Sequence, residues 1–193
     1  MKKILDFIRK YWILIMVVIA GIFYITNLLL KGPGQPIPSP TPINNSVATF
    51  GSLKPGVSTA NDVINVLGRP IDTKNENGQT VSEYKSTNQY RFNQVTFVNG
   101  TATLIKEIVN SNDNKDASII TSIYGTAQKV LYEKLPSSVF NLYVYPGNGI
   151  AYLGAADGTL KEIWYFQPTT IDSFITDWGQ DFSKTPVKDT NTY

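Results

Sequence analysis

The stretch that decides the fold is residues 52–109, which opens Lys54-Pro55-Gly56-Val57-Ser58-Thr59 and closes Val95-Thr96-Phe97-Val98-Asn99-Gly100, followed by Ile105-Lys106-Glu107-Ile108. Its landmarks recur further along the chain. Gly68 has a counterpart at Gly125, Asn99-Gly100 at Asp157-Gly158, and residues 105–108 at 160–163. Such a recurrence indicates one supersecondary unit used twice. The two copies cover about residues 52–109 and 116–167.

Local signals in the first copy predict a helix followed by antiparallel strands. Thr59 with Asp62 three residues later is a helix-capping pattern, and Gly68 with Pro70 ends the helix. Segments 81–85, 90–98 and 101–109 are rich in β-branched and aromatic residues, which favour strands. Asn99-Gly100 between two of them predicts a tight hairpin turn.

The second copy follows the polar loop 110–116 and predicts the same kind of unit. An apolar face over residues 119–124 indicates a helix, and strands are expected at 129–133, 139–145, 150–153 and 160–166. Ile171, Phe174, Ile175, Trp178 and Phe182 then recur at helical spacing. We expect a closing helix over residues 170–182 that lies across the sheet, with docking to a membrane or partner as the alternative. Residues 184–193 are polar and are expected to form a flexible tail.

The first 45 residues predict a membrane anchor and a stalk. Residues 11–30 carry no charge and are long enough, at about 1.5 Å per residue, to span a bilayer core of about 30 Å. A cleaved signal peptide is the alternative. Four basic residues within residues 1–10 predict a cytoplasmic amino terminus and an extracytoplasmic domain over 46–183. The proline-rich segment within residues 31–45 is typical of an extended linker.

The fold class predicted is therefore α+β: an N-terminal transmembrane helix, two tandem helix-plus-antiparallel-sheet repeats and a C-terminal amphipathic helix. The pattern Gly56-x-Ser58-Thr59-x-x-Asp62-Val63, then Leu67-Gly68-x-Pro70, then Phe97-x-Asn99-Gly100, resembles the BamE-like fold. The resemblance implies the fold of small outer-membrane assembly lipoproteins, used in tandem as in the β-lactamase-inhibitor proteins. The chain lacks the lipid-anchoring cysteine usual in that family, so a role in outer-membrane assembly is not implied.

Composition excludes several kinds of chemistry. The 193 residues contain no cysteine and no histidine, which removes disulfides, Cys/His zinc sites and Ser–His catalysis. The net charge of +2 divides into +4 for residues 1–31 and −2 for the remainder, so nucleic-acid binding is not expected. No phosphate-binding glycine motif is present. We therefore predict no catalytic residue, no cofactor and no metal site.

The residues left as candidates form a possible interaction surface. Glu107 and Glu162 occupy equivalent places in the two copies, and aromatic residues gather on the strands of the second copy. Paired carboxylates serve glycoside hydrolysis, but repeat symmetry and alternating charge on a solvated strand face are the favoured explanation of this pair. The sequence predicts a plasma-membrane protein, anchored through residues 11–30, whose outer domain binds an envelope protein without catalysis. Binding or hydrolysis of cell-wall glycan, and inhibition of a secreted enzyme, are the alternatives. The candidate surface consists of Tyr143, Tyr145, Tyr152, Tyr165, Glu107 and Glu162.

Overall fold

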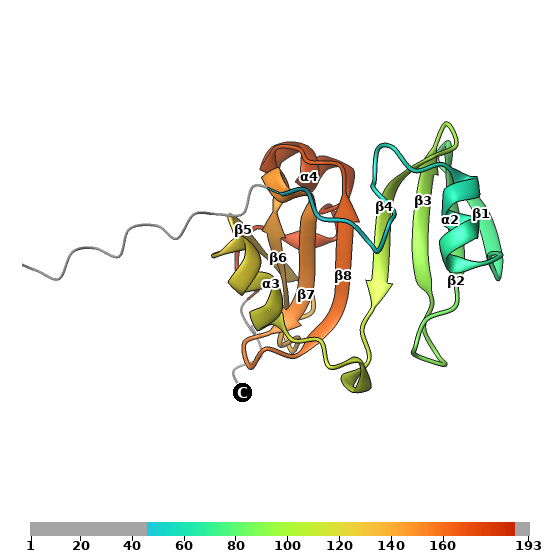
Figure 1. The fold of residues 1–193 in the computed structure, drawn as a ribbon. Coiled ribbons are helices and arrows are strands. Elements are labelled where there is room, and N and C mark those ends of the chain that lie inside the picture. The colour runs from blue at the N-terminus through green and yellow to red at the C-terminus, as the bar shows by residue number, and fades with distance from the viewer. Residues whose placement is uncertain (1–45, 188–193) are drawn as a thin grey trace, which may run out of the picture. The chain divides into compact units, whose positions relative to one another are not determined.

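A computed structural model describes residues 46–187 of the chain (Figure 1). These residues form a β-sheet with three short α-helices. In chain order the elements are α2 (Ala60–Leu67), β1 (Asp72–Glu76), β2 (Gln79–Tyr84), β3 (Asn93–Val98), β4 (Thr101–Ile108), α3 (Ala117–Tyr124), β5 (Lys129–Glu133), β6 (Phe140–Tyr145), β7 (Ile150–Ala155), β8 (Leu160–Phe166), α4 (Ile171–Asp177) and β9 (Phe182–Ser183).

All the strands belong to one antiparallel sheet, in the order β1-β2-β3-β4-β8-β7-β6-β5-β9. The central pair is β4 and β8, in which Leu104 lies opposite Phe166 and Ile108 lies opposite Glu162. The predicted fold class is therefore wrong. If the two halves folded separately, β4 and β8 would each leave an unpaired strand edge. In the structure these two edges hydrogen-bond to each other. Within residues 46–187 a single nine-stranded sheet results in place of two tandem units.

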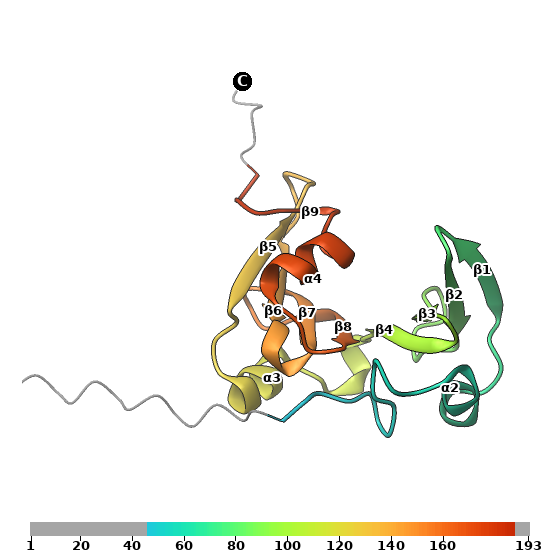
Figure 2. The same ribbon diagram turned by 90° about the horizontal axis from the view of Figure 1, so that it is seen from above.

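The sheet is strongly curved, and its two faces are covered differently. Figure 2 shows α2 and α3 on the convex side, with β1 and β2 on one flank and α4 with β9 on the other flank of the concave side. The segment before α2 crosses the convex side, where the Ala48 amide donates to the Asn148 carbonyl and the Gly56 amide donates to the Ala102 carbonyl. The concave side is covered by α4 only over the second half of the sheet.

Apolar side chains fill both faces. Under α2, fully buried Val63 packs with Leu53, Val95 and Ile105, and under α3, Ile120 packs in a second cluster. The third cluster lies beneath α4 and is centred on Phe174, which has no exposed surface. Helices of seven or eight residues are too short to be stable in water alone, so these contacts hold them in place.

Several local predictions are confirmed. The Thr59 side chain accepts from the Asp62 amide while the Asp62 carboxylate accepts from the Thr59 amide, forming the predicted capping box. Asn99 and Gly100 both have positive φ angles, 51° and 77°, and join β3 to β4. Such a turn needs positive φ at both central positions, and this requirement explains the choice of residues.

The closing helix is shorter than predicted. α4 ends at Asp177, where Gly179 follows and its amide donates to the Phe174 carbonyl. Glycine has low helix propensity, and the chain beyond it turns so that Phe182 pairs with Glu133 of β5. The expected apolar stripe nevertheless packs on the sheet, because Ile171, Ile175, Trp178 and Phe182 all contact the cluster beneath α4.

The prediction of a single-pass plasma-membrane protein with a signal-anchor helix is corrected. Within residues 46–187 no helix is long and apolar enough to cross a membrane. Eight helical residues extend only about 12 Å, whereas a bilayer core measures about 30 Å. The predicted span 11–30, the basic tail 1–10 and the linker 31–45 lie outside the described residues, as do residues 188–193 of the predicted tail.

Candidate binding groove

The concave face of β2, β3 and β4 forms a groove bounded by β1 on one side and α4 on the other. Cross-strand register places Glu83 opposite Gln94, Gln94 opposite Lys106, and Lys106 opposite Trp164. Residues opposite each other in a sheet point to the same face. The groove is formed by Gln79, Val81 and Glu83 of β2, Gln94, Thr96 and Val98 of β3, and Thr103, Leu104 and Lys106 of β4.

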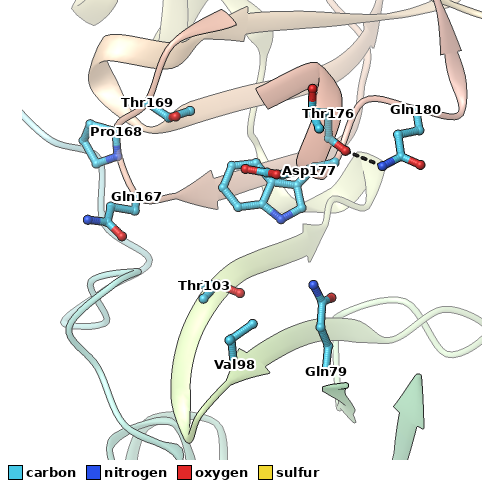
Figure 3. A pocket seen from close by; sticks show the side chains of 10 residues that line it. Gln79, Val98, Thr103, Gln167, Pro168, Thr169, Thr176, Asp177 and Gln180 are labelled. Carbon is cyan, nitrogen blue, oxygen red and sulfur yellow. Dashed lines mark hydrogen bonds between the residues drawn. The ribbon is translucent and has the colours of Figure 1, made fainter. Parts of the chain in front are cut away.

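One end of the groove opens into a pocket of about 640 Å³ against α4. Figure 3 shows Gln79, Val98 and Thr103 of the sheet on one side of this space, with Thr176, Asp177 and Gln180 on the other. Trp178 also lines the pocket, and its ring packs on Phe166 at 5.2 Å between centroids. Most of the lining is therefore amide, hydroxyl and carboxylate, with one indole.

A second pocket, of about 260 Å³, lies at the other end of the groove. It is lined by the loop between β2 and β3, where Arg91 forms an ion pair with Glu162 of β8. Tyr90 in the same loop is 82% exposed. An exposed tyrosine beside an arginine is a common composition for protein-binding surfaces.

Lys106 lies on the floor of the groove and lines the smaller of the two pockets. Its ammonium is 4.0 Å from the centre of the Trp164 ring, a cation–π contact. Burial lowers the pKa of Lys106 below its usual value, and the carboxylates of Glu162 and Asp181 offset part of that effect. The structure gives this ammonium no hydrogen-bond acceptor among the described residues, so its donors are available to a ligand.

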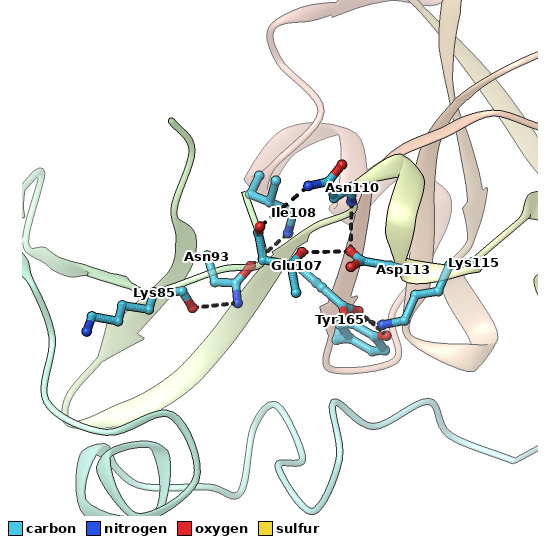
Figure 4. Close-up of polar contacts among 9 residues, drawn as sticks. Lys85, Asn93, Glu107, Ile108, Asn110, Asp113, Lys115 and Tyr165 are labelled. Carbon is cyan, nitrogen blue, oxygen red and sulfur yellow. Dashed lines mark hydrogen bonds and ion pairs between the residues drawn. The ribbon is translucent and has the colours of Figure 1, made fainter. Parts of the chain in front are cut away.

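Glu162 and Glu107, the carboxylates singled out in the sequence, lie on opposite faces of the sheet. Glu162 faces the groove, where the Trp164 indole donates to it at 2.7 Å. Glu107 faces the convex side, where the Tyr165 hydroxyl donates to it at 2.9 Å and Lys115 forms an ion pair with it (Figure 4). The two carboxylates therefore cannot act on one bond of a substrate, as glycoside hydrolysis would require.

The candidate tyrosines lie on the convex face with Glu107, near α3. Tyr145 and Tyr152 are buried, and Tyr143 stacks on Tyr152 with 4.7 Å between ring centres. The Tyr145 hydroxyl donates to the Gly125 carbonyl at the end of α3. Tyr165 is partly buried and contacts both the apolar cluster under α3 and the cluster under α2. These residues hold α3 on the sheet and present little free surface.

Burial also raises the pKa of Tyr145, Tyr152 and Tyr165. Desolvation is the largest cause at Tyr145, Tyr152 and Tyr165, and the negative charge of Glu107 adds to it at Tyr165. Their hydroxyls are consequently neutral over the physiological range. Among residues 46–187, no three Asp, Glu, His or Cys side chains are placed to share a metal ion.

Among the groove residues, sequence reasoning named only Glu162. Lys106, Arg91 and Trp178 were not among the predicted interaction residues, although a signal for the groove exists. In β2, Gln79 and Glu83 lie on the face opposite the one that holds buried Tyr84. In β3, Gln94 and Thr96 alternate with Val95 and Phe97, which belong to the core under α2. Such alternation marks a face that no element covers.

Comparison with known proteins leaves the family open. No family model and no curated protein matches the chain. A crystal structure of the DUF4309 family protein YjgB from Bacillus subtilis aligns with a TM-score of 0.43 and 16% identity, covering 60% of this chain and 83% of that one. A crystal structure of a cysteine-rich secretory protein from Staphylococcus aureus aligns with a TM-score of 0.45 and 9% identity, covering 76% of this chain and 52% of that one. Neither likeness is close enough to carry a functional argument, and the BamE-like resemblance stays a prediction.

Proposed function

We propose that residues 46–187 form a recognition module that binds a partner protein in the groove and performs no catalysis. The observation that carries this proposal is the uncovered concave face of β2–β4, which has a pocket at each end. A sheet face without a covering helix exposes side chains along its strands, and on this face Thr96 and Leu104 are the buried ones. Natural domains either bury such a surface against a partner or keep it polar. This face is polar, and its curvature gives it the concave shape of a binding groove.

The character of the lining favours a macromolecule over a small molecule. Pockets for small ligands are mostly apolar and enclose most of the ligand's surface. The larger pocket here is lined by three glutamines and three threonines and opens into the groove. The two ends of the groove carry large side chains: Tyr90 and Arg91 line the smaller pocket, and Trp178 lines the larger one. Tyrosine, arginine and tryptophan are the residues that most often dominate protein–protein binding energy.

The tyrosines on the convex face support the proposal less than the sequence suggested. Tyr145 and Tyr152 are packed near α3, so they cannot form the aromatic platform that glycan contact would need. The proposal therefore rests on the groove and does not include the predicted tyrosine surface.

The test exploits the absence of cysteine from the chain, because a single introduced cysteine then carries a crosslinker without background. Gln94→Cys and Thr103→Cys place the crosslinker in the groove, whereas Asn61→Cys and Ser122→Cys place it on the exposed sides of α2 and α3. We expect the groove variants, and not the helix variants, to capture one discrete protein.

The captured protein is then purified and titrated against the unmodified domain and against Thr103→Tyr, which fills the larger pocket without changing charge. Loss of binding in Thr103→Tyr, with Asn61→Tyr binding normally, supports the proposal. Equal capture from both faces, or normal binding by the filled variant, shows that the groove is not the binding site.

A further inference from the structure

We propose that the segment bound in the groove is an extended, basic stretch of polypeptide. This inference rests on the function proposed above and specifies the chemistry of the partner. It follows from two independent features: the carboxylates on both sides of the groove, and the unused donors of Lys106 on its floor.

The groove carries more negative than positive charge. Its carboxylates are Asp72, Glu76, Glu83, Glu162, Asp177 and Asp181, and its cations are Lys74, Arg91, Lys106 and Lys134, which donates to the Gln180 carbonyl beside Asp181, six against four. Two of the cations are already neutralised, Lys74 by Asp72 and Arg91 by Glu162. A groove with a net charge of −2 attracts a cationic partner and repels an acidic one.

Four carboxylates that form no ion pair with any described residue are distributed on both sides of the groove. Glu76 and Glu83 belong to the β1–β2 side, with Glu76 opposite Gln79 in the register. Asp177 and Asp181 belong to the α4 side. Within the described residues none of the four forms an ion pair. Lysine or arginine side chains on a chain lying along the groove could therefore reach a carboxylate on either side.

Lys106 explains why the occupant would be a polypeptide. An ammonium on the floor of an acidic groove repels cations there, but its three N–H donors seek acceptors. An extended polypeptide presents backbone carbonyl groups, which accept from an ammonium, together with side chains that extend outward to the carboxylates. A simple polyamine offers cations without acceptors and would meet only repulsion at Lys106. The floor and the two sides of the groove thus fit different parts of one ligand.

The experiment uses residues 1–193 and two pools of fluorescent decapeptides. In one pool every second residue is Lys or Arg, and in the other every second residue is Asp or Glu. Chitohexaose serves as a neutral glycan probe. Binding is measured by anisotropy, and by calorimetry for the glycan, at low and at physiological salt. The variants are Glu76→Gln/Glu83→Gln and Asp177→Asn/Asp181→Asn, with Glu133→Gln/Asp157→Asn as a control of equal charge change outside the groove.

We expect the basic pool to bind, the acidic pool not to bind, and each groove double variant to lose about three- to tenfold in affinity relative to the control. Lys106→Met should also weaken binding, although it makes the groove more acidic, because the ammonium N–H groups that donate to the peptide carbonyls are lost. Equal affinity in groove and control variants, no binding of the basic pool, or binding of chitohexaose alone would overturn the inference. The crosslinking experiment does not depend on charge, so a neutral partner captured in the groove would leave the proposed function standing.

Discussion

The two carboxylates at the β4–β8 junction offer a matched pair of perturbations. Glu162 and Glu107 have nearly equal side-chain exposure, 12% and 11%, and their cationic partners Arg91 and Lys115 are 38% and 39% exposed. Each also accepts one hydrogen bond from an aromatic residue of β8. Glu162→Gln and Glu107→Gln therefore remove the same interactions from opposite faces of the sheet.

The magnitude follows from those contacts. A hydrogen bond to a charged group contributes about 1.5–3 kcal/mol to stability, and one between neutral groups contributes about 0.5–1.5 kcal/mol. Replacing the carboxylate by an amide therefore weakens its hydrogen bond with the aromatic donor by about 1 kcal/mol. The half-exposed ion pair adds about 0.5–1 kcal/mol. We expect each variant to lose about 2 kcal/mol of unfolding free energy in urea titrations. Because the side chains lie on opposite faces, the double variant should lose about the sum.

The binding assay separates the two variants. Glu162→Gln alters the groove and should change affinity for the partner, while Glu107→Gln should leave affinity unchanged at equal stability. The reasoning is refuted if the two single variants differ in stability by more than about 1.5 kcal/mol, which exceeds the error of such measurements. It is refuted equally if Glu107→Gln impairs binding as strongly as Glu162→Gln.

Three further outcomes are expected. Phe174→Ala should cost about 3–5 kcal/mol of stability, because a fully buried ring at the centre of the α4 cluster is removed; urea denaturation checks this, and the loss of the groove's α4 side should weaken binding as well. Gly100→Ala should cost about 1–2 kcal/mol, because φ is 77° there although a Cβ would meet no atom within 4 Å. Gly147→Ala, at an equally open position without positive φ, should cost much less in the same assay. Finally, burial raises the pKa of Tyr145 and Tyr165, so the folded state holds these protons more tightly than the unfolded chain. The stability contributed by these two tyrosines should be constant below about pH 10 and fall above it, and a urea midpoint that does not fall between pH 10 and 12 would contradict this sign.

The local features of this protein follow from its sequence because they depend on a few neighbouring residues. The capping box at Thr59 and the turn at Asn99-Gly100 are examples, since backbone geometry and short-range hydrogen bonds fix them. The strand at Lys129–Glu133 forms where β-branched Val130 and aromatic Tyr132 favour an extended chain. In contrast, β1 gave no signal, because all five of its residues are exposed and only pairing with β2 makes it a strand.

The tertiary structure alone decided where the candidate residues point. Glu107 and Glu162 share a motif in sequence, yet the register of β4 against β8 places Ile108, and not Glu107, opposite Glu162. Side chains alternate between the two faces of a strand, so a shift of one residue moves a carboxylate from the groove to the far side. That register depends on hydrogen bonds between segments more than 50 residues apart, which no local pattern specifies. The same long-range pairing joined the halves into one sheet and left the groove uncovered.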